Sequence, residues 1–158
     1  MLSAFLALLL LGCFVVNDDP ADLEKQCHQG TWLVVSFSME GEETPSDVLD
    51  EIERVVDGER VVWYRQGRTF AATKTELDPT SDPPAIDVVP EGGPNREERI
   101  LGIYKLEEDV LMICMAPAGA DRPRNFDAEP GSGHTRMVFR RKPPEAEAEA
   151  EDDPGARP

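Results

Sequence analysis

The 158-residue sequence is poor in the residues that most enzymatic and metal sites require. It has two histidines and three cysteines. It contains no Cys-x-x-Cys pair, His-Glu-x-x-His helix, Gly-x-Ser-x-Gly turn or phosphate-binding glycine loop. The common sequence signs of zinc, hydrolase and nucleotide chemistry are therefore missing, and we expect no metal or other cofactor.

Basic residues are also scarce, at 16 against 32 acidic residues, which gives a formal net charge of −16. Binding to nucleic-acid phosphate requires a basic face, so the composition excludes nucleic acid as a partner. The basic residues that are present include a late cluster. It is predicted to be either a solvated rim or a surface for an anionic ligand, the acidic C-terminal segment or an acidic envelope polymer, and it comprises Arg122, Arg124, Arg136, Arg140, Arg141 and Lys142.

No hydrophobic run reaches the ~20 residues that span a bilayer. The apolar run Ala4–Leu11 instead has the length of a signal-peptide core, so residues 1–12 are predicted to be a signal peptide. Leu10-Leu11-Gly12-Cys13 resembles the bacterial lipobox, although no Lys or Arg precedes the run. We expect export to the cell envelope or periplasm with a lipid on Cys13 as the membrane anchor. The alternative is an ordinary signal peptide in which Cys13 is incidental.

The remaining chain has the length of one domain flanked by two tails. Residues 13–23 are predicted to be a tether, and residues 24–142 a folded domain. Residues 143–158 contain alternating Glu and Ala without an apolar stripe, which predicts a disordered acidic tail.

Short β-branched and aromatic runs separated by turn residues dominate the predicted domain. Val48–Val56 has apolar residues at helical spacing and is predicted to be one short helix after the first strand. The fold class is therefore mainly β, and the pattern predicts an antiparallel barrel or sandwich. The predicted strands are 31–39, 60–65, 69–77, 85–89, 99–106, 110–115 and 135–141.

The domain contains a series of short motifs, which are Gln29–Trp32, Leu77–Thr80, Pro84–Asp87, Gly102–Tyr104, Ile113–Cys114, Arg122–Pro123 with Phe126, and Gly131–His134. They stand in the order seen in an uncharacterised family of small exported domains expanded in planctomycete bacteria, which the chain resembles over residues 24–142. The family pattern has an apolar residue where this chain has His28.

Gly30-Thr31-Trp32 in the first strand, with Arg140 or Arg141 in the last, more distantly resembles the lipocalin signature. That resemblance implies an antiparallel lipocalin-like β-barrel of about seven to eight strands. In such a barrel Trp32 plugs one end and a late arginine lies across it. The alternative is a core tryptophan with the arginines at a solvated strand end.

The sequence predicts a non-catalytic envelope module that binds a small ligand or an envelope component. Its candidate contacts are Trp32, Tyr104, Met112 and Arg122. One alternative is a hydrolase using Ser132 and His134 with Asp78 or Asp87 as orienter, and another is a purely structural interaction module.

Asp78 is also predicted to close its own turn. Cys27 and Cys114 are predicted to be free thiols, with a disulfide as the alternative.

Overall fold

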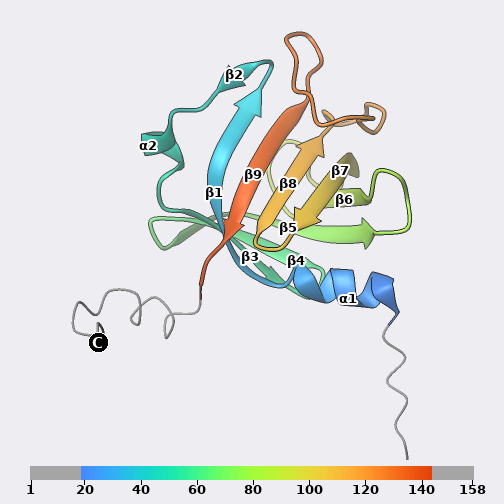
Figure 1. Ribbon diagram of the computed structural model, residues 1–158. Helices are drawn as coiled ribbons and strands as arrows, with labels where there is room; N and C mark the ends of the chain where they lie inside the picture. Colours follow the sequence, from blue (N-terminus) through green and yellow to red (C-terminus); the bar gives the residue numbers. More distant parts are fainter. Residues whose placement is uncertain (1–18, 144–158) are drawn as a thin grey trace, which may run out of the picture.

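The computed structural model describes residues 19–143, so the predicted signal peptide, Cys13 and residues 144–158 lie outside the described chain. Two short helices and nine strands follow one another (Figure 1). They are α1 (Pro20–Cys27), β1 (Gly30–Met39), β2 (Glu42–Glu43), α2 (Ser46–Leu49), β3 (Ile52–Asp57), β4 (Arg60–Arg65), β5 (Arg68–Asp78), β6 (Ala85–Pro90), β7 (Ile100–Glu107), β8 (Val110–Met115) and β9 (Thr135–Arg141).

Eight of these strands form a closed antiparallel barrel. From β3 to β9 each strand pairs with the next, β1 pairs with β3, and the additional pairing of β1 with β9 closes the sheet. The closing register runs from Trp32 opposite Arg141 to Met39 opposite Thr135, with a bulge between Val34 and Ser36. The two-residue β2 pairs with the end of β1. The predicted mainly-β fold with an antiparallel barrel is confirmed.

Strand alternation directs one face of the sheet into a packed interior. Trp32, Tyr104, Leu111 and Phe139 each have no exposed surface. They belong to one hydrophobic cluster, in which large side chains from β1, β7, β8 and β9 meet. The interior of the barrel around Trp32 is therefore filled by side chains.

A short helix follows the first strand, as predicted, but its predicted extent, Val48–Val56, is wrong. Helix α2 stops at Leu49, and Glu51 has a left-handed φ of 69°, which ends helical geometry. From Ile52 the chain forms β3, whose β-branched residues pair with those of β4, as in Val55 opposite Val62. Cross-strand pairing outweighs the helical spacing of the same residues. As a strand, β3 buries Arg54 and Val56.

Helix α1, which precedes the first strand, lies across one end of the barrel (Figure 1). It begins at the Asp19 cap, whose carboxylate accepts a hydrogen bond from the Ala21 amide at 3.0 Å. After the helix, the Gln29 side chain accepts from the Gly58 amide at 2.8 Å and donates to the Gly58 carbonyl at 3.2 Å. These bonds fasten the end of α1 to the turn between β3 and β4.

Candidate functional site

Trp32 and Arg141 form a stacked pair at the α1 end of the barrel. The guanidinium carbon of Arg141 lies 4.2 Å from the centroid of the Trp32 ring. Arg141 also donates to the carbonyls of Cys27 and Gln29, the latter at 2.9 Å, and pairs with the Asp109 carboxylate at 3.0 Å. Arg140, the other arginine considered from the sequence, is exposed. The structure therefore places Arg141 across the tryptophan.

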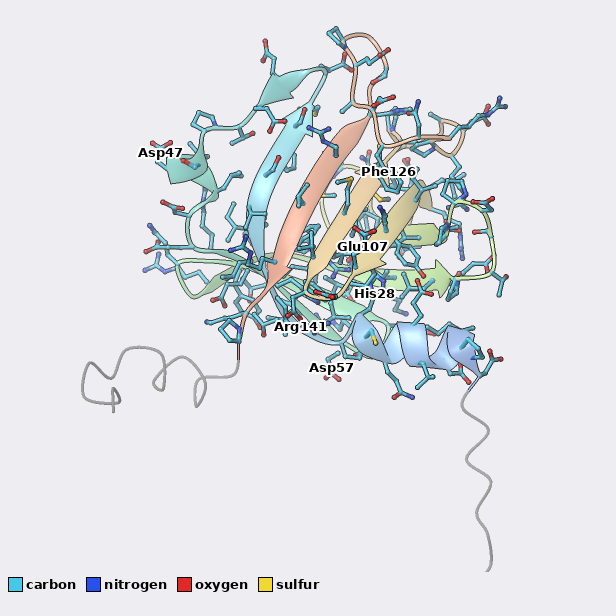
Figure 2. All side chains as sticks on the ribbon, in the orientation of Figure 1. His28, Asp47, Asp57, Glu107, Phe126 and Arg141 are labelled. Atoms are coloured by element: carbon cyan, nitrogen blue, oxygen red, sulfur yellow. The ribbon has the colours of Figure 1, made fainter. Side chains whose placement is uncertain are left out.

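His28 joins α1 to this end of the interior, and Figure 2 shows it at the same end as Arg141. Its carbonyl accepts the indole N–H of Trp32 at 2.9 Å, and its ring meets Tyr104 edge-on with centroids 4.6 Å apart. Burial and the Glu24 carboxylate raise the pKa of Tyr104. Tyr104 therefore forms a neutral, buried wall behind His28.

The structure does not bring Met112 and Arg122 to Trp32 and Tyr104. Met112 lies between inward-facing Leu111 and Ile113 on β8, so its side chain is on the outer face. Arg122 lies in the long connection before β9, where its guanidinium pairs with Asp87 at 2.7 Å and donates to the Gly102 carbonyl at 2.6 Å. Arg122 fastens that connection to the outside of the barrel.

The side chains of Ser132 and His134 form no nucleophile pair within the described chain. The Ser132 hydroxyl donates to the Glu129 carbonyl at 2.7 Å and accepts the backbone N–H of His134 at 3.1 Å. The His134 ring instead lies 3.3 Å from the Asp127 carbonyl.

The Asp78 carboxylate accepts hydrogen bonds from the amide and the hydroxyl of Thr80 at 3.0 and 2.6 Å. These bonds form the predicted turn.

The two described cysteines are free thiols, with Cys27 exposed and Cys114 buried, as predicted. Burial raises the pKa of Cys114, which disfavours the reactive thiolate.

Among residues 19–143, no group of three or more His, Cys, Asp or Glu side chains could hold a metal ion. Neither described helix is long and apolar enough to cross a bilayer.

A pocket of about 510 Å³ opens between the end of α1 and strands β3 and β5. Val56 and Leu77 provide an apolar wall, while His28, Arg54 and Thr75 provide buried polar groups. Its size lies within the range of small-molecule sites. The remaining lining residues are Lys25, Gln26, Gln29, Gly58, Glu59 and Glu76.

Arg54 is the least expected group in this pocket, because it is only 2% exposed. Its guanidinium lies 5.6 Å from the centroid of Phe139, and no hydrogen bond or ion pair from the described residues reaches it. Burial lowers the pKa of Arg54 to about 10.

His28 is equally buried, at 1% exposed, and neither ring nitrogen has a hydrogen-bond partner within residues 19–143. Burial, and then the positive charges of Arg54 and Arg141, lower the pKa of His28 to about 3. The imidazole is therefore neutral at ordinary pH, with one N–H donor and one acceptor nitrogen unused.

Comparison with known proteins adds no identification: no family model, curated protein or solved structure matches this chain. What the fold defines is a small, closed, eight-stranded antiparallel barrel. The resemblance to the planctomycete family stays a prediction.

Arg54 was not predicted as a site residue, because a helix over Val48–Val56 puts it on the polar face. The inward position follows only from the period of a strand, in which Arg54 and Val56 share a face. The one sequence sign at this site is His28, where the family pattern has an apolar residue.

Proposed function

We propose that this protein is a non-catalytic, lipocalin-like binding module for a small ligand, exported and held at the cell envelope by a lipid on Cys13. The pocket of about 510 Å³ at the α1 end carries the proposal, since it combines apolar walls with a few buried polar groups. The lipocalin-like description is supported by Arg141 stacked on the buried Trp32.

The position of the pocket suits a binding module because its walls come from elements that are held together. Gln29 ties the end of α1 to the turn at Gly58, and β3 and β5 belong to the closed sheet. A preformed wall lowers the cost of ordering the site when a ligand enters.

The test is binding of a neutral probe, 1-octanol, to the purified protein and to a variant with a filled pocket rim. Gln26 is exposed on α1 and lines the pocket, so Gln26→Trp adds bulk there without entering the core. The matched control is Arg68→Trp, at an exposed position of β5 that does not line the pocket.

We expect 1-octanol to raise the melting temperature of the parent and of Arg68→Trp, because a ligand that binds only the folded state stabilises it. The rise should be lost in Gln26→Trp. An equal rise in all three proteins contradicts a ligand site at this pocket, and so does failure of the parent to bind 1-octanol, octanoate and octyl phosphate.

A further inference from the structure

Arg54 presents an unpaired positive charge to the pocket. A buried guanidinium is ordinarily paired, because removing the charge from water is costly unless a counter-charge and hydrogen bonds replace the solvent. Here the described chain supplies the face of Phe139, while Nη1 is buried without a partner. A negatively charged group from outside residues 19–143 would complete the site.

His28 gives a second and independent sign on the same wall. It is buried in the segment between α1 and β1, and both of its ring nitrogens lack partners within the described chain. Its neutral ring can donate one hydrogen bond to an oxygen in the pocket. Thr75, which is 8% exposed, brings a hydroxyl to the same lining from β5.

The carboxylates at the pocket do not neutralise Arg54. Glu76 pairs with Arg99 at 2.6 Å, and Glu59 is exposed at the turn after β3. Lys25 at the rim pairs with Asp22 at 4.0 Å, so Arg54 carries the positive charge of the inner wall. The inner wall is therefore cationic although the whole chain is strongly acidic.

We infer that the pocket binds a small amphiphilic anion, a carboxylate or phosphate monoester on a short apolar chain, with its head on Arg54. The planar guanidinium can bind two oxygens of either head group side by side, and His28 can donate to the same head. Val56 lies one inward position nearer the end of β3 than Arg54, so it can pack against the apolar chain together with Leu77. This inference rests on the proposed function and specifies its ligand class.

The test compares three probes with the same apolar chain: octanoate, octyl phosphate and neutral 1-octanol. We expect the parent to bind at least one anion about 10-fold or more tightly than 1-octanol, as a charge-assisted hydrogen bond predicts. The anion that binds more tightly identifies the head group. In Arg54→Met, which keeps a long apolar side chain, the preference should fall to about 1-fold.

The control Arg68→Met removes an exposed arginine on β5, outside the pocket, and should keep the preference. His28→Phe retains a ring against Tyr104 but loses the donor, so it should weaken octanoate about 3-fold or more while leaving 1-octanol unchanged. It also tests the inference if Arg54→Met does not fold. Without ligand, Arg54→Met should be at least as stable as the parent, because an unpaired buried charge has been removed.

Equal binding of the anions and 1-octanol by the parent overturns the inference and leaves the proposed function standing. Failure of all three probes to bind overturns both. A chain ending at Pro143 that binds octanoate much more tightly than the full chain would make carboxylates of residues 144–158 the occupant. That result would overturn an external anion as the ligand.

Discussion

Trp32 combines complete burial with an indole hydrogen bond to His28 and a guanidinium on its face. Trp32→Ala should lower the free energy of unfolding by about 3–5 kcal/mol, because removing a large side chain from a packed interior leaves a cavity. Trp32→Phe should cost much less, since most of the apolar volume remains. Denaturant unfolding measures both, and a cost below about 1 kcal/mol for Trp32→Ala would contradict its place in the core.

The neighbouring arginines of β9 provide a matched pair of variants. Arg141 donates to two backbone carbonyls and stacks on Trp32, whereas Arg140 is exposed. Arg141→Met should therefore destabilise the protein by about 1.5–3 kcal/mol, the usual contribution of hydrogen bonds to a charged group. Arg140→Met should change stability by less than about 0.5 kcal/mol. Equal effects in denaturant unfolding would argue against the stacked pair as a structural unit.

His28 should make stability depend on pH. Its pKa is about 3 in the folded protein and 6.5 when unperturbed, so the unfolded chain binds a proton first as the pH falls. Stability is therefore lost as the pH decreases below about 6.5, by about 2 kcal/mol between pH 7 and pH 5. His28→Phe should remove this part of the pH dependence.

Unfolding by denaturant at pH 7 and pH 5 measures the difference between His28→Phe and the parent. The control is His134→Gln, because His134 is only partly buried and contacts a loop carbonyl. An identical pH dependence in the parent and His28→Phe would show that the His28 ring takes up a proton in the folded protein.

At the scale of elements, the sequence predicts seven of the eight barrel strands. The strand that it does not predict is β3, which carries Arg54, and for that reason the sequence does not predict the pocket either. Alternating β-branched runs between turn residues identify the predicted strands within a residue or two of the observed bounds. In β3 the residues at 52, 55 and 56 satisfy helical spacing as well, and only pairing with β4 decides between the two structures. A local pattern cannot contain that information.

Two other contacts were beyond sequence reasoning for a similar reason. Met112 lies in a continuous apolar run, so the sequence does not show which of its residues point into the barrel. The face that Met112 occupies is decided by the register of β8 against β7 and β9. The pairing of Arg122 with Asp87 joins the connection before β9 to β6 across distant sequence. In contrast, the turn at Asp78 is local and was predicted correctly.

The connection from residue 116 to residue 134 should loosen when its ion pair is removed. Arg122→Ala deprives the partly buried Asp87 and the Gly102 carbonyl of a partner, which should cost about 1–3 kcal/mol. Arg124→Ala, two residues later at an exposed position, is the control. We expect faster limited proteolysis within the connection for Arg122→Ala alone, and equal cleavage of both variants would contradict this role.

At the scale of the whole molecule, the proposed anchor and the barrel should be separable. Cys13 lies outside the described residues, and the barrel closes through pairing of β1 with β9 without it. Cys13→Ser should therefore release the protein from the membrane fraction while leaving its melting temperature unchanged. Membrane fractionation of cells measures the first effect, and identical distribution of the parent and Cys13→Ser would rule out a lipid at this position.

Closure of the barrel by its first and last strands also sets an order of folding. Neighbouring strands can pair as soon as their own residues meet, whereas β1 and β9 meet only after the whole intervening chain is present. Arg141 then bonds to the carbonyls of Cys27 and Gln29, on either side of His28. Strand β9 thus holds in place the segment that brings His28 to the pocket, so an unfinished or clipped chain would have open strand edges and an unsupported site.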